Sequence, residues 1–177
     1  MQDQDQIIKD CLANHRQGQE KLYRTVYPAL MLLCKRFFAD EHTALEVLND
    51  GMLKVYRQIE KYDSSKGDLF NWIYTIVRNT ALDKLKRSAL PLTSEINDDD
   101  PGLFSVTPLN SLEEKEFYVF LDVLNPATRA VCSLYYFEGF NIREIGEILN
   151  CSVGTVKWHL SETRNKLRPV LKKYYFK

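Results

Sequence analysis

The sequence has few of the residues that build turn-rich β proteins, and it contains no long apolar run. Its 177 residues include only seven glycines and six prolines, which disfavours a β sandwich or barrel with many tight turns. The longest apolar run, residues 29–34, is far too short to cross a bilayer as a helix. Hydrophobic residues nevertheless make up 45% of the chain, enough to build a core. A mainly helical globular protein is therefore predicted.

Cysteine is also sparse and scattered. Cys11, Cys34, Cys132 and Cys151 form no CxxC motif and lie near no histidine pair, so neither a zinc site nor a redox dithiol is predicted. Four isolated thiols are typical of a reduced, intracellular protein, and the polar, acidic N-terminus is unlike a signal peptide. We expect a cytoplasmic protein without a metal or other cofactor.

Residues suited to catalysis are equally few. The histidines are His15, His42 and His159, and none lies in a nucleophile motif, a phosphate-binding loop or a metal-ligand spacing. We therefore expect no enzymatic activity.

The charges balance at 24 basic and 24 acidic residues, but their distribution is uneven. Residues 151–177 hold seven Lys or Arg and one Glu, whereas residues 89–110 hold four acidic residues and no basic one. Three prolines and a glycine also interrupt the helical pattern within that acidic stretch. The sequence thus predicts an all-α protein of two small helical domains, residues 1–88 and 111–177, joined by an acidic linker at residues 89–110.

Apolar residues at helical spacing predict about four helices in the N-terminal domain, which pack as a bundle because no single face can be buried alone. The stripes run over residues 7–12, 23–37, 44–59 and 69–85, with Pro28 as a kink or break in the second. A loop at residues 62–68 precedes the last stripe.

The C-terminal domain carries signals for helix starts at three places. Residues 111–114 have the form of a capping box, and Asn125 and Asn141 are N-cap candidates. A helix over residues 142–149, a short turn and a second helix from Val153 together form a helix-turn-helix.

In the second helix of this pair, Val153, Val156, Leu160 and Leu167 are predicted to face the core. The residues predicted to face outward or to lie at the flanks are Gly154, Thr155, Lys157, Trp158, His159, Ser161, Glu162 and Asn165. Cations suited to phosphates follow at Arg164, Lys166, Arg168, Lys172 and Lys173. This face suits the major groove of DNA. A solvated amphipathic helix is the simpler alternative, although a large exposed tryptophan needs a partner.

Residues 152–168 (SVGTVKWHLSETRNKLR) resemble the last conserved region of bacterial RNA polymerase sigma factors of the extracytoplasmic-function class, whose recognition helix begins and ends similarly. Residues 44–56 (ALEVLNDGMLKVY) resemble the core-binding segment of that family. Residues 70–87 (FNWIYTIVRNTALDKLKR) resemble its promoter-melting and downstream-element segment. The resemblance implies a factor without chemistry of its own, which binds core RNA polymerase and directs it to promoters.

The resemblance assigns polymerase contacts to the helix that spans residues 44–60. The implied contact of this helix is the clamp of the largest subunit, and the flap of the second-largest subunit is implied as a further polymerase contact of the chain. The candidate residues on this helix are Leu45, Asn49, Asp50, Leu53 and Tyr56. Packing of the same face inside the bundle is the alternative.

The resemblance also implies that the loop at residues 62–68 and the helix after it capture an unstacked base of the downstream, minus-ten element. The planar and hydrogen-bonding groups available for this are Tyr62, Asp63, Ser64, Ser65, Asn71 and Trp72. The residues implied to contact the separated strand or its phosphates are Arg78, Asn79, Lys84, Lys86 and Arg87. Alternatively, Trp72 belongs to the core and the cations form a solvated face.

Recognition of the upstream, minus-thirty-five element is implied for the outward face of the last helix. The residues assigned to it are Thr155, Lys157, Trp158, His159, Ser161, Glu162, Arg164, Lys166 and Arg168. The family usually has a small residue and an arginine where Trp158 and His159 stand, and an arginine in place of Glu162. A different base preference is therefore expected, in which Glu162 can accept from a cytosine amino group.

Other functions and partners remain open on the sequence alone. A stand-alone helix-turn-helix regulator accounts for residues 111–177 but leaves the N-terminal motifs unexplained. A helical adaptor with a basic tail would show no salt-dependent DNA binding. Members of the resembled family are commonly held by an anti-sigma factor, so such a partner is expected. Their linkers pass through the RNA exit channel of the polymerase, although a flexible tether accounts equally well for residues 89–110.

Overall fold

The structure is a computed structural model that describes residues 2–88 and 120–175. These residues form helices and connecting turns, with no β-strand among them, which confirms the predicted all-α class. The chain divides into two compact units. Unit 1 is Met1–Lys35 with Asp40–Lys84, and unit 2 is Arg36–Ala39 with Leu85–Lys177.

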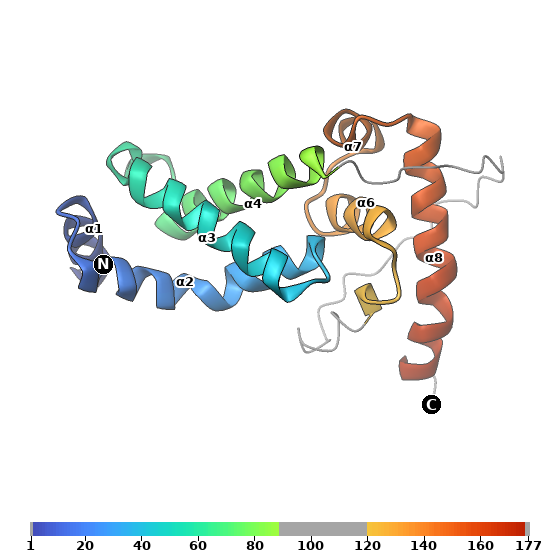
Figure 1. Cartoon of the computed structure of the whole chain (residues 1–177), viewed down its shortest axis with the longest axis horizontal. Coiled ribbons are helices and arrows are strands. Elements are labelled where there is room, and N and C mark those ends of the chain that lie inside the picture. The colour runs from blue at the N-terminus through green and yellow to red at the C-terminus, as the bar shows by residue number, and fades with distance from the viewer. Residues whose placement is uncertain (1, 89–119, 176–177) are drawn as a thin grey trace. The chain divides into compact units, whose positions relative to one another are not determined.

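Four α-helices and two 3-10 turns make up the described part of the chain before residue 89 (Figure 1). They are α1 (Gln2–Leu12), α2 (Arg16–Phe37), α3 (Glu41–Gln58), η1 (Ile59–Lys61), η2 (Ser64–Lys66) and α4 (Leu69–Arg87). The four predicted stripes correspond to α1, α2, α3 and α4. Contrary to a break at Pro28, α2 runs through this residue as one helix.

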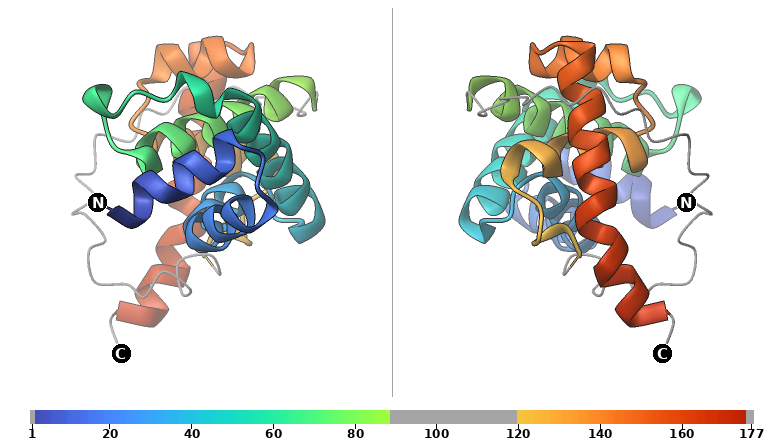
Figure 2. Two further views of the ribbon diagram at one scale, coloured as in Figure 1. Left: turned by 90° about the vertical axis from the view of Figure 1, so that its left-hand side faces the viewer. Right: turned by 90° about the vertical axis from the view of Figure 1, so that its right-hand side faces the viewer.

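Buried apolar side chains of α2, α3 and α4 form the core of unit 1. Leu30, Leu48 and Ile73 are fully buried, one from each helix. Asp40 begins α3 as its N-cap, because its carboxylate accepts hydrogen bonds from the Thr43 N–H at 2.7 Å and the Thr43 hydroxyl at 2.6 Å. Figure 2 shows α1 in dark blue lying across the N-terminal end of α2.

A glycine allows α3 and α4 to approach closely. A Cβ atom added at Gly51 would lie 2.9 Å from Cγ2 and 3.0 Å from Cα of Val77. Gly51 and Val77 are both buried, so the contact lies inside the core. Only a residue without a side chain fits at this crossing.

The described helices after residue 119 are α6 (Pro126–Tyr136), α7 (Ile142–Leu149) and α8 (Val153–Tyr175) (Figure 1). Asn125 caps α6 by accepting from the Thr128 N–H at 2.8 Å. Asn141 and Glu144 form a complete capping box at α7. Both predicted helix starts are confirmed. The predicted linker at residues 89–110 and the helix start at residues 111–114 lie outside the described residues.

The turn between α7 and α8 has the geometry of a helix-turn-helix. Asn150 ends α7 in the left-handed conformation with φ of 53°. Its N–H and that of Cys151 both donate to the Gly146 carbonyl, the latter at 2.9 Å. Both α6 and α7 pack against α8, and the C-terminal turns of α8 extend past them (Figure 1).

The inward face of α8 differs from the predicted one. Thr155, His159 and Thr163 are buried, at 5%, 1% and 1% exposed, whereas Val153 is 42% exposed. Val156 and Leu160 are buried as predicted. The outward placement of Thr155 and the flanking placement of His159 are therefore wrong, and neither side chain is open to a DNA groove.

Hydrogen bonds explain why polar side chains are buried on this face. The Thr155 and Ser152 hydroxyls lie 2.9 Å apart, and the Thr163 hydroxyl donates to the His159 carbonyl at 2.8 Å. Nδ1 of His159 lies 2.9 Å from Oγ1 of Thr128 on α6. Paired polar groups of this kind can replace apolar ones in a helix interface.

Candidate functional site

The predicted polymerase-binding face of α3 is largely open in unit 1. Asn49 and Asp50 are exposed, Leu45 and Tyr56 are half-buried, and Leu53 is 47% exposed. An aliphatic side chain exposed to this degree between polar neighbours is suited to contact a partner protein. The buried face of the same helix is a different set of residues, which includes Val47, Leu48 and Met52.

Two residues of the predicted polymerase-binding face are joined to α2 by hydrogen bonds. The Tyr23 hydroxyl donates to Oδ1 of Asn49 at 2.8 Å. The Tyr56 hydroxyl donates to the Gln19 carbonyl at 2.8 Å, and burial raises the pKa of Tyr56. Tyr56 therefore fixes α3 against α2 as well as lining the outer surface.

The loop between α3 and α4 is stabilised by its own side chains. Asp63 accepts from the Ser65 N–H at 3.0 Å and the Ser65 hydroxyl at 2.7 Å, and these bonds lower the pKa of Asp63. Asp68 begins α4 by accepting from the Asn71 N–H at 2.9 Å and its amide nitrogen at 2.6 Å. The loop thus presents exposed Ser64 and Ser65, and Asn71 is exposed in the first turn of α4.

Tyr62 and Trp72 lie together at the base of this loop. Their ring centroids are 5.7 Å apart, and the Tyr62 hydroxyl donates to the Gly67 carbonyl at 3.0 Å. Both side chains are half-buried. Trp72 therefore contributes to the packing of unit 1 and also exposes part of its ring to solvent. A packing role and a role in base capture are both compatible with this position.

An aromatic pair on α4 was not singled out by the sequence analysis. Phe70 is 39% exposed, and its ring centroid lies 6.1 Å from that of Tyr74, one helical turn later. The signal was the (i, i+4) spacing of two aromatics outside the buried stripe. The pair lies on the same helix as the candidate base-capturing residues Asn71 and Trp72.

The cations of α4 differ in their surroundings. Lys84 binds the Glu46 carboxylate at 2.9 Å, so its charge is partly balanced within unit 1. Arg78 is half-buried, whereas Asn79 is exposed one residue later. Lys86 and Arg87 are exposed at the end of the helix. The exposed Lys86 and Arg87 are the cations best placed to meet a phosphate backbone.

On α8, the predicted DNA-binding face is narrower than expected, because Thr155 and His159 are buried. Lys157 and Arg168 are exposed, whereas Trp158, Ser161 and Arg164 are half-buried. Glu162 binds Lys166 at 3.1 Å, one turn further along the helix. Lys157, Trp158, Ser161 and Glu162 remain as the candidates for contacts with bases.

The buried His159 packs against Trp158, which belongs to the candidate face of α8. Its ring meets that of Trp158 edge-on, with centroids 4.8 Å apart, so it constrains the tryptophan. Burial lowers the pKa of His159, partly opposed by the nearby Glu162 carboxylate. Nε2 of His159 is buried without a hydrogen-bond partner, which further disfavours the charged ring.

The described residues contain no group of three His, Cys, Asp or Glu that could hold a metal ion. Burial raises the pKa of Cys34 and of Cys132 to about 12, so both remain protonated thiols at neutral pH. In the described residues, no helix is both long and apolar enough to span a membrane.

Comparison with protein families gives two matches in the order of the two units. The model described as sigma-70 region 2 matches residues 22–90, and the model described as sigma-70, region 4 matches residues 120–169. The first range includes α3, the loop and α4, and the second includes the helix-turn-helix. The first match therefore contains two of the candidate surfaces described above, and the second contains the one on α8.

The chain is also similar to whole proteins that are named as sigma factors. The ECF RNA polymerase sigma factor SigW of Bacillus subtilis (strain 168) is 26% identical over 190 residues, covering 95% of this chain and 98% of that protein. SigM of the same organism is 29% identical over 148 residues, with 81% and 86% covered. A solved structure of the sigma factor RpoE with the anti-sigma factor NepR from Bartonella quintana is 23% identical, with a TM-score of 0.47 and 86% and 96% covered.

Proposed function

The chain belongs to the extracytoplasmic-function (ECF) RNA polymerase sigma factors, and we propose that three helices divide the tasks of such a factor. α3 binds core RNA polymerase, α4 with its preceding loop binds the downstream promoter element, and α8 binds the upstream element. The two family matches, each containing one or more of these helices, are the observation that carries the proposal. The domain boundaries at residues 88 and 111 are part of it.

The role of α3 is supported by the composition of its open face. Exposed Asn49 and Asp50 lie beside the 47% exposed Leu53, so an apolar contact would be surrounded by hydrogen-bonding groups. An apolar centre with a polar rim is the usual composition of a specific protein interface. We assign Leu45 and Tyr56 to its edge because both are half-buried.

The role of the loop and α4 is supported by their side-chain chemistry. Ser64, Ser65 and Asn71 offer exposed hydrogen-bonding groups beside the paired rings of Tyr62 and Trp72. A base that leaves the duplex stack needs both kinds of group. Exposed Lys86 and Arg87 at the end of α4 would bind the phosphates of the same strand.

The role of α8 is supported by its position as the second helix of a helix-turn-helix. Lys157, Trp158, Ser161 and Glu162 would meet base edges, while Arg164, Lys166 and Arg168 would position the helix on phosphates. Thr155 and His159 are omitted because they are buried. A stand-alone regulator is not supported, since it leaves the region 2 match over residues 22–90 without a role.

The factor would act without catalysis of its own, in the cytoplasm where its polymerase works. The clamp of the largest subunit and the flap of the second-largest subunit are its proposed contacts. We also propose an anti-sigma factor as its regulator, which would cover the polymerase-binding face. Release from that partner would then expose the α3 surface to the polymerase.

Co-elution with core RNA polymerase on gel filtration tests the assignment of α3. The test variant replaces Asn49, Asp50 and Leu53 together by alanine, and the full-length wild-type chain is expected to co-elute while this variant does not. A control replaces Gln17, Arg24 and Thr25 by alanine, which are three exposed residues of α2. Equal co-elution of both variants would reject the α3 surface, and no co-elution of the wild type with cognate core would reject polymerase binding.

A further inference from the structure

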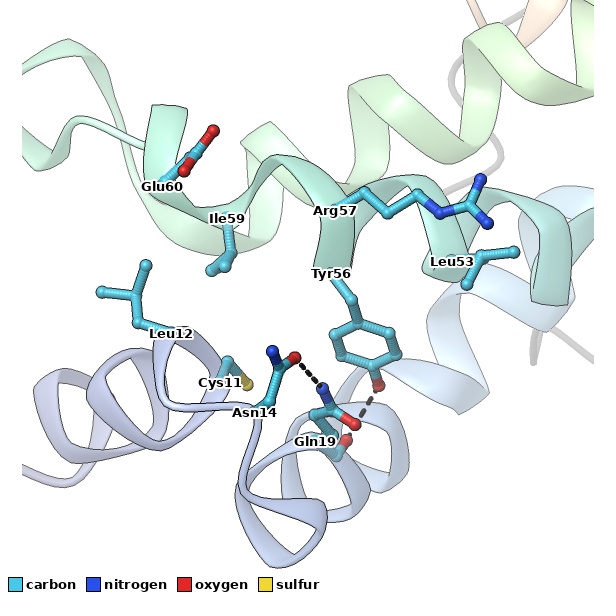
Figure 3. Close-up of a pocket in the computed structure, with 9 residues that line it drawn as sticks. All are labelled: Cys11, Leu12, Asn14, Gln19, Leu53, Tyr56, Arg57, Ile59 and Glu60. Carbon is cyan, nitrogen blue, oxygen red and sulfur yellow. Dashed lines mark hydrogen bonds between the residues drawn. The ribbon is translucent and has the colours of Figure 1, made fainter.

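A hollow of about 430 Å³ lies in unit 1 between α1 and the C-terminal end of α3. Its floor is apolar, since Cys11 is 2% and Ile59 is 4% exposed. Figure 3 shows Leu12 and Leu53 at opposite ends of the hollow, with the Tyr56 ring between them. Leu12 is 50% and Leu53 is 47% exposed, so both lie open to solvent.

The walls of the hollow are fixed before any partner arrives. The Tyr56 hydroxyl donates to the Gln19 carbonyl at 2.8 Å, and the Gln19 amide donates to the Asn14 side chain at 3.3 Å (Figure 3). Asn14 adopts the left-handed conformation with φ of 55°, which turns the chain sharply between α1 and α2. A preformed apolar hollow loses little entropy when a side chain enters it.

The hollow is lined by one helix inside the sigma-70 region 2 match and by another outside it. α3 lies within the sigma-70 region 2 match, whereas α1 precedes its first residue, 22. Leu53 and Tyr56, which belong to the proposed polymerase-binding face, also line the hollow. The hollow therefore continues that face onto a helix outside the matched region.

We infer that α1 is part of the polymerase-binding surface and that the hollow receives an apolar side chain of core RNA polymerase. This inference rests on the proposed role of α3. Leu12, Cys11 and Ile59 would contact the incoming side chain, and the Tyr56 ring and Leu53 would continue the apolar contact along the hollow. Arg57 and Glu60 lie at the edge of the hollow, where opposite charges suit a polar rim around an apolar anchor.

Affinity of the full-length chain for cognate core polymerase, measured by competition with a fluorescently labelled wild-type chain, tests the inference. Leu12→Asp and Leu53→Asp are each expected to raise the dissociation constant at least tenfold. Leu12→Met, which keeps an apolar side chain, is expected to bind as the wild type does. Ala29→Asp is the charge control, because Ala29 is exposed on α2 and does not line the hollow.

The outcomes separate this inference from the proposed function. If Leu53→Asp weakens binding and folded Leu12→Asp does not, α1 is not part of the surface, while the role of α3 stands. If the wild type itself does not bind core, the proposed function fails. If Leu12→Asp instead dissociates a dimer of the free chain and leaves core affinity unchanged, the hollow holds a second copy and the inference is overturned. Circular dichroism melting of each variant checks that it is folded.

Discussion

At the scale of single residues, His159 is a neutral side chain in the packing of α8. Burial lowers its pKa below the ordinary value of 6.5, so the unfolded chain takes up a proton before the folded one does. Folding stability therefore rises with pH in this range and is lost as pH falls from 6.5 through the lowered pKa. The contribution of His159 to folding stability is therefore complete only above its pKa in the unfolded chain.

Urea unfolding at pH 7.5 and pH 5.5 measures this effect. The wild type is expected to lose more stability between these pH values than His159→Gln does, because glutamine cannot take up the proton. His15 and His42 are exposed and remain in both proteins, so they act as an internal control. An equal loss of stability in the two proteins would show that His159 does not cause the pH dependence.

Glu162 and Lys172 are expected to affect DNA binding in different ways. Glu162 lies on the proposed base-reading face, whereas Lys172 is exposed near the end of α8. In holoenzyme binding to a set of upstream-element variants, Glu162→Ala should change their ranking by about 1–3 kcal/mol at the affected base. Lys172→Ala should weaken all variants alike and reduce the salt dependence.

Lys166 complicates the substitution of Glu162, since the pair also supports the helix. An (i, i+4) pair of this kind contributes about 0.2–0.5 kcal/mol to helix stability, so Glu162→Gln serves as the control that keeps the shape of the side chain. A uniform loss across every upstream-element variant for Glu162→Ala would contradict a role in base recognition.

At the scale of elements, the crossing of α3 and α4 depends on Gly51. Gly51→Ala would place a methyl group 2.9 Å from Cγ2 and 3.0 Å from Cα of Val77. Overpacking of a core typically costs about 1–3 kcal/mol, against which alanine gains up to about 1 kcal/mol of helix propensity. A net loss of stability is therefore expected in urea unfolding.

Gly154→Ala is the matched control for that experiment. Its added Cβ would meet only the Ser152 hydroxyl, at an ordinary 3.5 Å. Since Gly154 is exposed near the start of α8, the substitution should be neutral or stabilising. If Gly51→Ala proves as stable as Gly154→Ala, the crossing of α3 and α4 does not require a residue without a side chain.

The helices themselves could be predicted from the sequence, but the facing of α8 could not. Asn125 and Asn141 are N-caps whose local hydrogen bonds depend only on neighbours in the chain, so pattern and capping rules identified them. The burial of His159 depends on Thr128, which is 31 residues away on α6. A hydropathy pattern treats such partnered polar residues as solvent-facing and therefore rotates the helix wrongly.

The hollow beside α3 was missed for a related reason. It combines Leu12 with Leu53, and these residues come from helices that the sequence places far apart. No spacing rule links them, because their neighbourhood arises from the packing of α1 near η1. The candidate face of α3, in contrast, lies on a single helix, and the family resemblance of residues 44–56 implied it.

For the molecule as a whole, promoter selection is expected only when the chain is bound to core polymerase. Regions 2 and 4 match in sequence order on either side of residues 91–119. Neither core polymerase alone nor the chain alone is then expected to select promoters. The two DNA-binding surfaces should be needed together, because each reads only a short element.

Run-off transcription from genomic fragments of the encoding organism, with core polymerase in the presence and absence of the chain, tests this claim most directly. Discrete new start sites are expected, which appear only with both components and share an upstream and a downstream element. Sequence-specific DNA binding by the chain alone, without any new start site when core polymerase is added, would contradict it.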